Sequence, residues 1–139
     1  MSIADAVLPA VMKDEGFRRK PYRCSAGALT VGYGTNLDEG IDDDEAMFLL
    51  EHRLMKREHE CRQAFPWFAR LGPVRQGVIV RMAYQLGTAG VMGFRDMRRA
   101  LEAGDYAAAA DAMLDSKWAR HDSPARAHRE AAAMRSGQQ

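Results

Sequence analysis

The sequence predicts an α+β protein that is mainly helical, with one short β segment inside an otherwise helical chain. Apolar residues recur with the helical period along most of the 139 residues, whereas residues 28–34 alternate with a period of two. The chain is 47% hydrophobic and 28% charged, which is typical of a soluble globular protein. At this length a hydrophobic core forms without the help of a disulfide or a metal ion. We therefore expect a single domain over residues 1–139.

The first predicted helix ends before Gly16. An apolar face over residues 3–11 indicates a helix, and the glycine that follows is a typical helix stop. Because proline is tolerated in the first turn of a helix, Pro9 predicts a start near residues 5–7. Glu15 then lies in the last turn, where the helix dipole disfavours a carboxylate. This unfavourable position suggests that Glu15 has a function.

The β segment has two unequal faces. Alternation assigns Leu29, Val31 and Tyr33 to one face, and Thr30, Gly32 and Gly34 to the other. The first face is expected to pack, whereas the second carries a single hydroxyl group. Glycines weaken a strand, so a bare face indicates close approach by a ligand or by other backbone. A tight hairpin bend explains the same glycines equally well.

Helical signals return at Asp42 and continue to the end of the chain. Asp42 and Glu45 resemble a capping box that begins a helix of about twenty residues, long enough to bridge two lobes. Glycines, prolines and capping residues then divide the rest into short helices that we expect at residues 73–86, 95–103, 106–117 and 124–136. Short connections between such helices are typical of a compact bundle.

Charge and cysteine content argue against several classes of protein. The net charge is +1, which does not indicate a strongly basic nucleic-acid-binding protein. Residues 1–60 carry −4 and residues 61–139 carry +5, so the second half suits a polyanion such as cell wall or nucleic acid. Two cysteines do not form a disulfide framework. Without a run of about 18 apolar residues or a basic, cleavable N-terminus, we expect a chain made in the cytosol, with no membrane insertion.

The motif around Glu15 extends into a pattern that covers roughly residues 5–135. Its parts, in order, are Glu15-Gly16-Phe17, Tyr22-Arg23-Cys24, Leu29-Thr30-Val31-Gly32-Tyr33-Gly34, Met82-Ala83-Tyr84-Gln85-Leu86-Gly87, Gly93-Phe94, Ser116-Lys117-Trp118 and Pro124-Ala125-Arg126-Ala127. In residue type, order and spacing, the chain resembles the phage lysozymes of glycoside hydrolase family 24, the T-even phage type. The resemblance implies a lysozyme-like fold. A small N-terminal lobe with a short β-hairpin or sheet (about 14–45) would be joined by a long helix to a larger helical lobe (about 60–139 plus the N-terminal helix).

The resemblance implies three catalytic residues. Glu15 takes the position of the general acid, which protonates the leaving oxygen of a glycosidic bond. Thr30 takes the position of a hydroxyl that holds the attacking water. Position 24 is normally an aspartate that orients this water, but here it is Cys24. Arg23 and three other basic residues nearby could lower its pKa, so that the thiolate acts as a base or as a nucleophile; a structural thiol is the alternative.

The same resemblance implies the substrate contacts. Gly32, Tyr33, Gln85 and Arg126 are expected to bind substrate, and the family's arginine at the Arg126 position pairs with the catalytic glutamate. Taken alone, Gln85 and Arg126 would be ordinary polar residues on helix surfaces. We expect no cofactor and no metal, because His52, His59 and Cys61 have poor spacing for a metal site. Trp67 and Phe68 are expected in the core rather than against a sugar.

These expectations define a peptidoglycan-degrading muramidase that hydrolyses the β-1,4 bond between N-acetylmuramic acid and N-acetylglucosamine. We expect a monomeric phage endolysin that accumulates in the host cytoplasm and reaches the wall with the help of a holin or another membrane permeabiliser. A lytic transglycosylase acting on the same bond and a non-catalytic wall-binding module are the alternatives. A nucleic-acid-binding module is disfavoured, because it leaves the spacing of Glu15, Cys24 and Thr30 unexplained.

Overall fold

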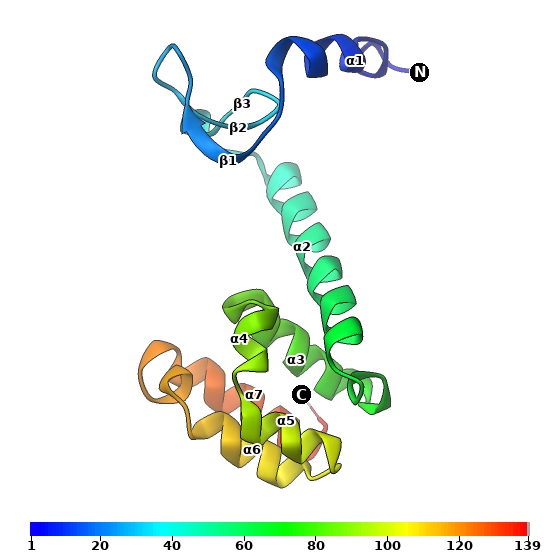
Figure 1. Cartoon of the computed structure of the whole chain (residues 1–139), viewed down its shortest axis with the longest axis vertical. Coiled ribbons are helices and arrows are strands. Elements are labelled where there is room, and N and C mark those ends of the chain that lie inside the picture. The colour runs from blue at the N-terminus through cyan, green and yellow to red at the C-terminus, as the bar shows by residue number, and fades with distance from the viewer. Residues whose placement is uncertain (139) are drawn as a thin grey trace. The chain divides into compact units, whose positions relative to one another are not determined.

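The computed structural model describes residues 1–138, which form two compact units (Figure 1). The first unit is Met1–Phe48 and the second begins at Leu49, so the boundary falls inside one helix. The elements are α1 (Ile3–Glu15), β1 (Arg18–Arg23), β2 (Leu29–Gly32), β3 (Thr35–Asn36), α2 (Asp43–Ala64), α3 (Pro73–Leu86), α4 (Thr88–Met92), α5 (Arg95–Glu102), α6 (Tyr106–Leu114) and α7 (Pro124–Ser136). The predicted mainly helical α+β class is confirmed. Within residues 1–138, no helix combines the length and the apolar character needed to cross a membrane.

Helix α1 begins earlier than the sequence predicted. The Ser2 hydroxyl accepts the Asp5 N–H at 3.1 Å, and the Asp5 carboxylate accepts the Ser2 N–H at 2.9 Å, so the two residues form a capping box. The predicted start near residues 5–7 is therefore wrong, and Pro9 lies inside the helix. The capping box fixes the first turn, and Pro9 costs one backbone hydrogen bond in the middle. The predicted end is correct, because α1 stops at Glu15.

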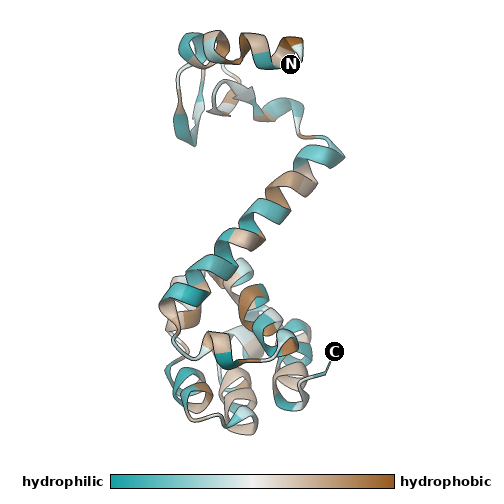
Figure 2. Cartoon of the chain, turned by 90° about the vertical axis from the view of Figure 1, so that its right-hand side faces the viewer, coloured by the Kyte–Doolittle hydropathy of each residue, from teal (hydrophilic) through white to brown (hydrophobic). Residues whose placement is uncertain are grey.

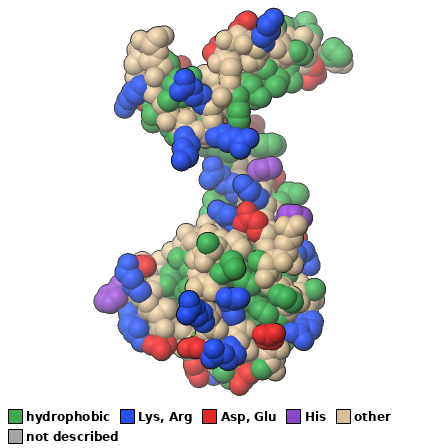
Figure 3. Space-filling view, in the orientation of Figure 1, with side chains coloured by type: hydrophobic (Ala, Val, Ile, Leu, Met, Phe, Trp, Pro, Cys, Tyr) green, Lys and Arg blue, Asp and Glu red, His purple; other side chains and the backbone are tan. Residues whose placement is uncertain are grey.

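The strands of the first unit form a three-stranded antiparallel sheet in the order β1-β2-β3. β1 was not predicted, because its sequence is basic and lacks an alternating apolar pattern. Its arginine and lysine side chains are exposed, and basic side chains gather on this unit in Figure 3. The guanidinium of Arg18 lies 4.5 Å from the ring centroid of Tyr22, a cation–π contact along the strand.

The predicted single strand through Gly34 is in fact a hairpin. β2 ends at Gly32, and the chain turns back into β3 through Gly32 and Gly34, which have φ angles of 66° and 75°. The alternative explanation of the glycines, a tight bend, is therefore the correct one. The expected packing face is wrong as well: Thr30 is buried, whereas Leu29 and Val31 are only half-buried. Thr30 tolerates burial because its hydroxyl donates a hydrogen bond to backbone.

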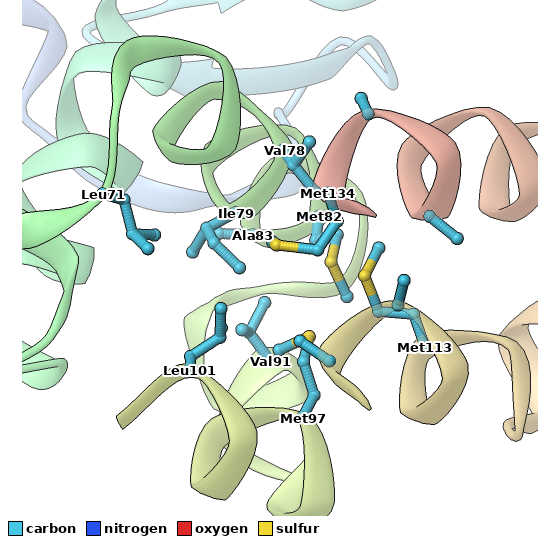
Figure 4. Close-up of a cluster of buried hydrophobic side chains, with 14 of the residues drawn as sticks. Leu71, Val78, Ile79, Met82, Ala83, Val91, Met97, Leu101, Met113 and Met134 are labelled. Atoms are coloured by element: carbon cyan, nitrogen blue, oxygen red, sulfur yellow. The ribbon is translucent and has the colours of Figure 1, made fainter. Parts of the chain in front are cut away.

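The second unit contains the hydrophobic core. Helix α2 begins with the predicted capping box, in which Asp42 and Glu45 exchange two hydrogen bonds of 2.8 Å. Hydrophilic residues line much of this helix (Figure 2), and Cys61 is its one fully buried residue. The buried side chains of the other helices meet in one cluster (Figure 4), which includes Leu71, Val78, Ile79, Met82, Val91, Met97, Leu101, Met113 and Met134. Among the predicted core residues, Val78, Ile79 and Met82 are fully buried.

Two short segments of the second unit differ from the prediction. Helix α4 follows α3 directly after Gly87 and was missed, because five residues carry no clear periodic signal. Helix α6 ends at Leu114 rather than at residue 117. The Ser116 hydroxyl donates to the Met113 carbonyl and accepts the Ala119 N–H. These bonds begin a wide π-helical turn over Trp118–Asp122.

Glu60 attaches α2 to the start of α4. Its carboxylate accepts hydrogen bonds from the Thr88 hydroxyl and, at 2.8 Å, from the Arg57 guanidinium. The hydrogen bond from Thr88, followed by that from Arg57, holds the pKa of Glu60 below its usual range. Because the pKa of Glu60 is lower in the folded state, its carboxylate stabilises that state fully at pH values above the unfolded-state pKa. This stabilisation is lost as the pH falls through the folded-state pKa.

We predict that Glu60→Gln lowers the free energy of unfolding by about 1–2 kcal/mol at pH 7. The difference between the two proteins should shrink as the pH falls through the folded-state pKa of Glu60, because the wild-type carboxylate becomes protonated. Urea unfolding across this range measures the effect. Glu58→Gln is the matched control, since the exposed Glu58 contacts Arg62 at only 3.5 Å and should change stability little. A Glu60 effect independent of pH would contradict this account.

Candidate active site

Glu15 lies directly against the hairpin bend of the sheet. It is exposed and is the last residue of α1, and Gly16, with a φ of 69°, ends the helix. A Cβ atom added to Gly34 would lie 2.5 Å from Oε2 of Glu15 and 2.8 Å from its carboxyl carbon. A larger residue at position 34 would therefore displace this carboxylate, and the φ of 75° at Gly34 also favours glycine. Of the glycines on the predicted bare face, Gly34 is approached by Glu15, whereas the space beside Gly32 is open.

The sheet brings the three predicted catalytic residues into the same unit. Along β2, Thr30 pairs with Tyr22, and the strand ends at the bend that contacts Glu15. Cys24 follows the last residue of β1, at the opposite end of β2. Thr30 therefore lies along the strand between the end near Glu15 and the end near Cys24.

Cys24 lies in a tight turn whose backbone surrounds its thiol. Its N–H donates to the Ala28 carbonyl at 3.0 Å, and its carbonyl accepts the Gly27 N–H at 2.9 Å. Hydrogen bonds from the backbone amides of Ala26 and Ala28, followed by the Thr30 hydroxyl, hold the pKa of Cys24 below its usual value. The sequence reasoning expected a lowered pKa from the neighbouring basic residues. The direction is right, but the cause is wrong.

Arg23, the basic neighbour of Cys24, interacts with groups other than the thiol. The guanidinium of Arg23 donates to the Gly27 carbonyl at 3.1 Å and lies 3.8 Å from the carboxylate of Asp38. Cys61 provides the contrast, because burial raises its pKa to about 11. Of the two cysteines, Cys24 is therefore the one whose thiolate the structure favours.

Thr30 is buried, and its hydroxyl already has a partner. Its Oγ1 donates to the Ala28 carbonyl at 3.0 Å, and the same hydroxyl is a hydrogen-bond neighbour of the Cys24 thiol. A hydroxyl carries one proton, so it cannot donate to both groups at once. While it donates to Ala28, Thr30 can still accept a hydrogen bond from water. Thr30 and Cys24 therefore form one local network.

The two other predicted residues of the hairpin lie at the bend. Gly32 is half-buried and ends β2, whereas Tyr33 is exposed. The ring of Tyr33 lies 5.0 Å, between centroids, from the ring of Phe17, which is also exposed. Substrate contact by either residue stays a prediction, with the bend available on the surface of this unit.

Gln85 uses both ends of its amide within the protein. Its Nε2 donates to the Ser123 hydroxyl at 2.7 Å, and its Oε1 accepts the Trp118 indole N–H at 3.0 Å. The side chain therefore links α3 to the Trp118–Asp122 turn and to the start of α7. A structural role of this kind was not predicted. A sugar would have to compete with these two partners, so substrate contact by Gln85 stays a prediction.

Arg126 is exposed on α7 and makes no ion pair or hydrogen bond through its side chain within residues 1–138. Its expected pairing with Glu15 joins residues of different units and stays a prediction. It lines a pocket of about 530 Å³ in the second unit, together with Arg81, Arg129 and Glu130. Sequence reasoning missed the ion pair between Arg81 and Glu130, for which a single sequence offers no signal.

Trp67 and Phe68 lie where the sequence predicted them. Trp67 and Phe68 are buried, and the ring of Trp67 stacks on that of Phe65 at 4.7 Å, which confirms their position in the core. Among the described residues, no group of three histidine, cysteine or acidic side chains could hold a metal ion. The predicted catalytic residues of the first unit supply a carboxylate, a thiol and a hydroxyl group.

A carboxylate at the end of the first helix, a short antiparallel sheet and a larger helical unit together define a lysozyme-like α+β protein. Comparison with known families narrows this class. Residues 12–132 match the model of the family described as Phage lysozyme, and the chain belongs to that family. The matched region contains Glu15, Cys24, Thr30, Gln85 and Arg126.

Among individual proteins, the chain is similar to the pre-baseplate central spike protein Gp5 of Enterobacteria phage T4. The two are 28% identical over an alignment 139 positions long. The alignment covers 76% of this chain and 24% of Gp5. The chain therefore spans about a quarter of the length of this relative.

Proposed function

We propose that the protein is a muramidase that hydrolyses the β-1,4 bond between N-acetylmuramic acid and N-acetylglucosamine in peptidoglycan. The observation that carries the proposal is membership of the phage lysozyme family over residues 12–132, a range that includes the segment with Glu15. The close approach of Glu15 to Gly34 supports it, because this approach places the carboxylate beside the sheet that carries Thr30.

In the proposed reaction, the protonated carboxyl of Glu15 donates its proton to the glycosidic oxygen as the bond to the anomeric carbon breaks. A water molecule attacks that carbon from the opposite face and gives a proton to the Cys24 thiolate, with the Thr30 hydroxyl accepting its second hydrogen bond. Return of this proton to Glu15 through solvent completes the cycle. The reaction consumes one water and leaves one new reducing end. The lowered pKa of Cys24 supports its role as the base.

The experiment that tests this proposal is digestion of purified peptidoglycan, with reducing ends measured by a colorimetric assay and products identified by mass spectrometry. New reducing ends on muramic acid are expected. Products that weigh one water less, with anhydro-muramic ends, would identify a lytic transglycosylase instead. Binding to the wall without any cleavage would identify a wall-binding module, and neither binding nor cleavage would reject the proposal.

We predict that activity depends on an ionisable group at position 24. Cys24→Ala should lower kcat by about 10–100-fold, because it removes the base, and Cys24→Asp should retain far more activity than Cys24→Ser. Rates of wall digestion measure this series. As a companion test, iodoacetamide should modify Cys24 at a lower pH than it modifies a free thiol, and far faster than the buried Cys61. Full activity of both Cys24→Ala and Cys24→Ser would leave Cys24 a structural thiol.

For the biological setting, we propose a monomeric endolysin that accumulates in the host cytoplasm and reaches peptidoglycan with a holin or a similar membrane permeabiliser. The similarity to a phage central spike protein favours a second candidate, a lysozyme carried in the virion. Mass spectrometry of purified virions separates the two. Protein found only in the lysate supports the endolysin, whereas a fixed number of copies in each particle supports the virion protein.

A further inference from the structure

Helices α3 and α7 are joined by a two-pronged ion pair between Arg81 and Glu130. Nε of Arg81 lies 2.6 Å from Oε1 of Glu130, and Nη2 lies 2.8 Å from Oε2, so both carboxylate oxygens are engaged. The side chain of Glu130 is only 8% exposed. The guanidinium of Arg81 thus balances the negative charge of the buried carboxylate, and the pairing raises the pKa of Arg81.

Arg126 lies one helical turn before Glu130 on α7. Residues separated by four positions share a face of a helix, and opposite charges at this spacing attract each other. Both residues line the same pocket, with Arg81 opposite them on α3. Even so, the side chain of Arg126 makes no ion pair or hydrogen bond within the described part of the chain, whereas Arg81 engages both oxygens of Glu130.

We propose that Arg81 is a positioning residue: by holding both oxygens of Glu130, it keeps the guanidinium of Arg126 free for an anionic group of the substrate. The inference rests on the proposed function and on the predicted contact of Arg126 with the wall polymer. Peptidoglycan carries carboxylates on its peptides, and a free guanidinium is the group suited to bind a carboxylate through two hydrogen bonds.

The physical reason is the high cost of an unpaired buried charge. Without Arg81, the carboxylate of Glu130 has no counterion, and taking Arg126 as a new partner is the least costly way to restore one. Arg126 would then be drawn toward its own helix and lost to the substrate. If Glu130 is removed together with Arg81, no carboxylate remains to capture Arg126, so the double variant should recover what the single variant loses.

The test follows the reactivity of Arg126 toward phenylglyoxal, a reagent for guanidinium groups, by mass spectrometry of the folded protein. We expect Arg81→Met to slow the modification of Arg126 at least about fivefold relative to the exposed Arg95, and Arg81→Met/Glu130→Leu to restore it. The value of kcat/KM for wall digestion should fall about tenfold in the single variant and recover in the double variant. Because the reagent needs no enzymatic activity, this result is separate from the success or failure of the muramidase proposal.

The matched control is Arg75→Met. Arg75 donates to the Met134 and Arg135 carbonyls at the end of α7, at 2.6 and 3.0 Å, and so holds the same helix without covering a carboxylate. This variant should lose stability but keep the wild-type reactivity of Arg126. If Arg81→Met does not fold, Arg81→Lys, which holds Glu130 less completely, should give a smaller slowing.

Three results would overturn the inference. One is an unchanged reactivity of Arg126 in folded Arg81→Met, and another is a double variant as slow as the single one. The third is wild-type wall digestion by Arg126→Ala, which would show that the substrate does not need the guanidinium of Arg126.

Discussion

Replacing Glu15 by glutamine is expected to reduce wall digestion by a factor of about 10³ or more, close to complete loss. Glutamine has nearly the same shape but no acidic proton, so the leaving oxygen would depart as an unstabilised alkoxide. The exposed position of Glu15 at the end of α1 means that the substitution removes no core contact. Initial rates of reducing-end release measure the loss, and thermal unfolding should be nearly unchanged.

The control for this substitution is Glu39→Gln, which alters another exposed carboxylate of the same unit. Its activity should equal that of the wild type. Wall digestion by Glu15→Gln at more than about a tenth of the wild-type rate would exclude Glu15 as the general acid, because loss of a general acid costs far more.

Replacing Gly34 by alanine is expected to lower kcat by about 10²-fold through displacement of Glu15. The new methyl group would lie 2.5 Å from the Glu15 carboxylate, far inside van der Waals contact, so the exposed side chain must move. A displacement of about 1 Å at a reacting group is enough for a loss of this size. Kinetics on purified wall measure kcat, and a crystal structure of the variant would show the new position of Glu15.

Gly40→Ala separates this effect from backbone strain. Gly40 has a φ of 77° and a ψ of −166°, which non-glycine residues rarely adopt, but an added Cβ there meets nothing within 4 Å. We expect it to cost at least as much stability as Gly34→Ala while leaving kcat unchanged. In a Glu15→Gln background, Gly34→Ala should cause no further loss, because both changes act through the same carboxylate. Additive losses would mean that Gly34 acts by another route.

Local sequence rules predicted most of the helices and the position of Glu15 at the end of the first one. Glycine and proline at the ends of α3, the capping box at Asp42 and the stop at Gly16 are signals carried by neighbouring residues, and each was read correctly. The start of α1 was missed, because Ser2 and Asp5 outweigh the cost of Pro9. Strand β1 was missed because its basic side chains are exposed, so no buried face leaves a pattern.

The residues proposed for the site come from the sequence, whereas their interactions come from the structure. The type and spacing of Glu15, Cys24 and Thr30 can be read along the chain. The groups that lower the pKa of Cys24 cannot be read in this way, because they are backbone amides of a turn. Every residue but proline has such an amide, so the sequence does not show that the amide of Ala28 lies beside the thiol. The pairing of Arg81 with Glu130 joins residues 49 positions apart, a distance over which a single sequence gives no information.

Strand β1 has a further consequence for the protein at high concentration. It is an edge strand, with backbone groups on one side that no other strand of the sheet covers, and such edges invite pairing between molecules and aggregation. Its sequence places four cationic side chains and Pro21 along that edge, together with a bulge between residues 18 and 22. Repulsion between like charges and the missing amide proton of proline both oppose the addition of a second copy. The basic strand that obscured the sheet in the sequence is therefore also what keeps the sheet from growing.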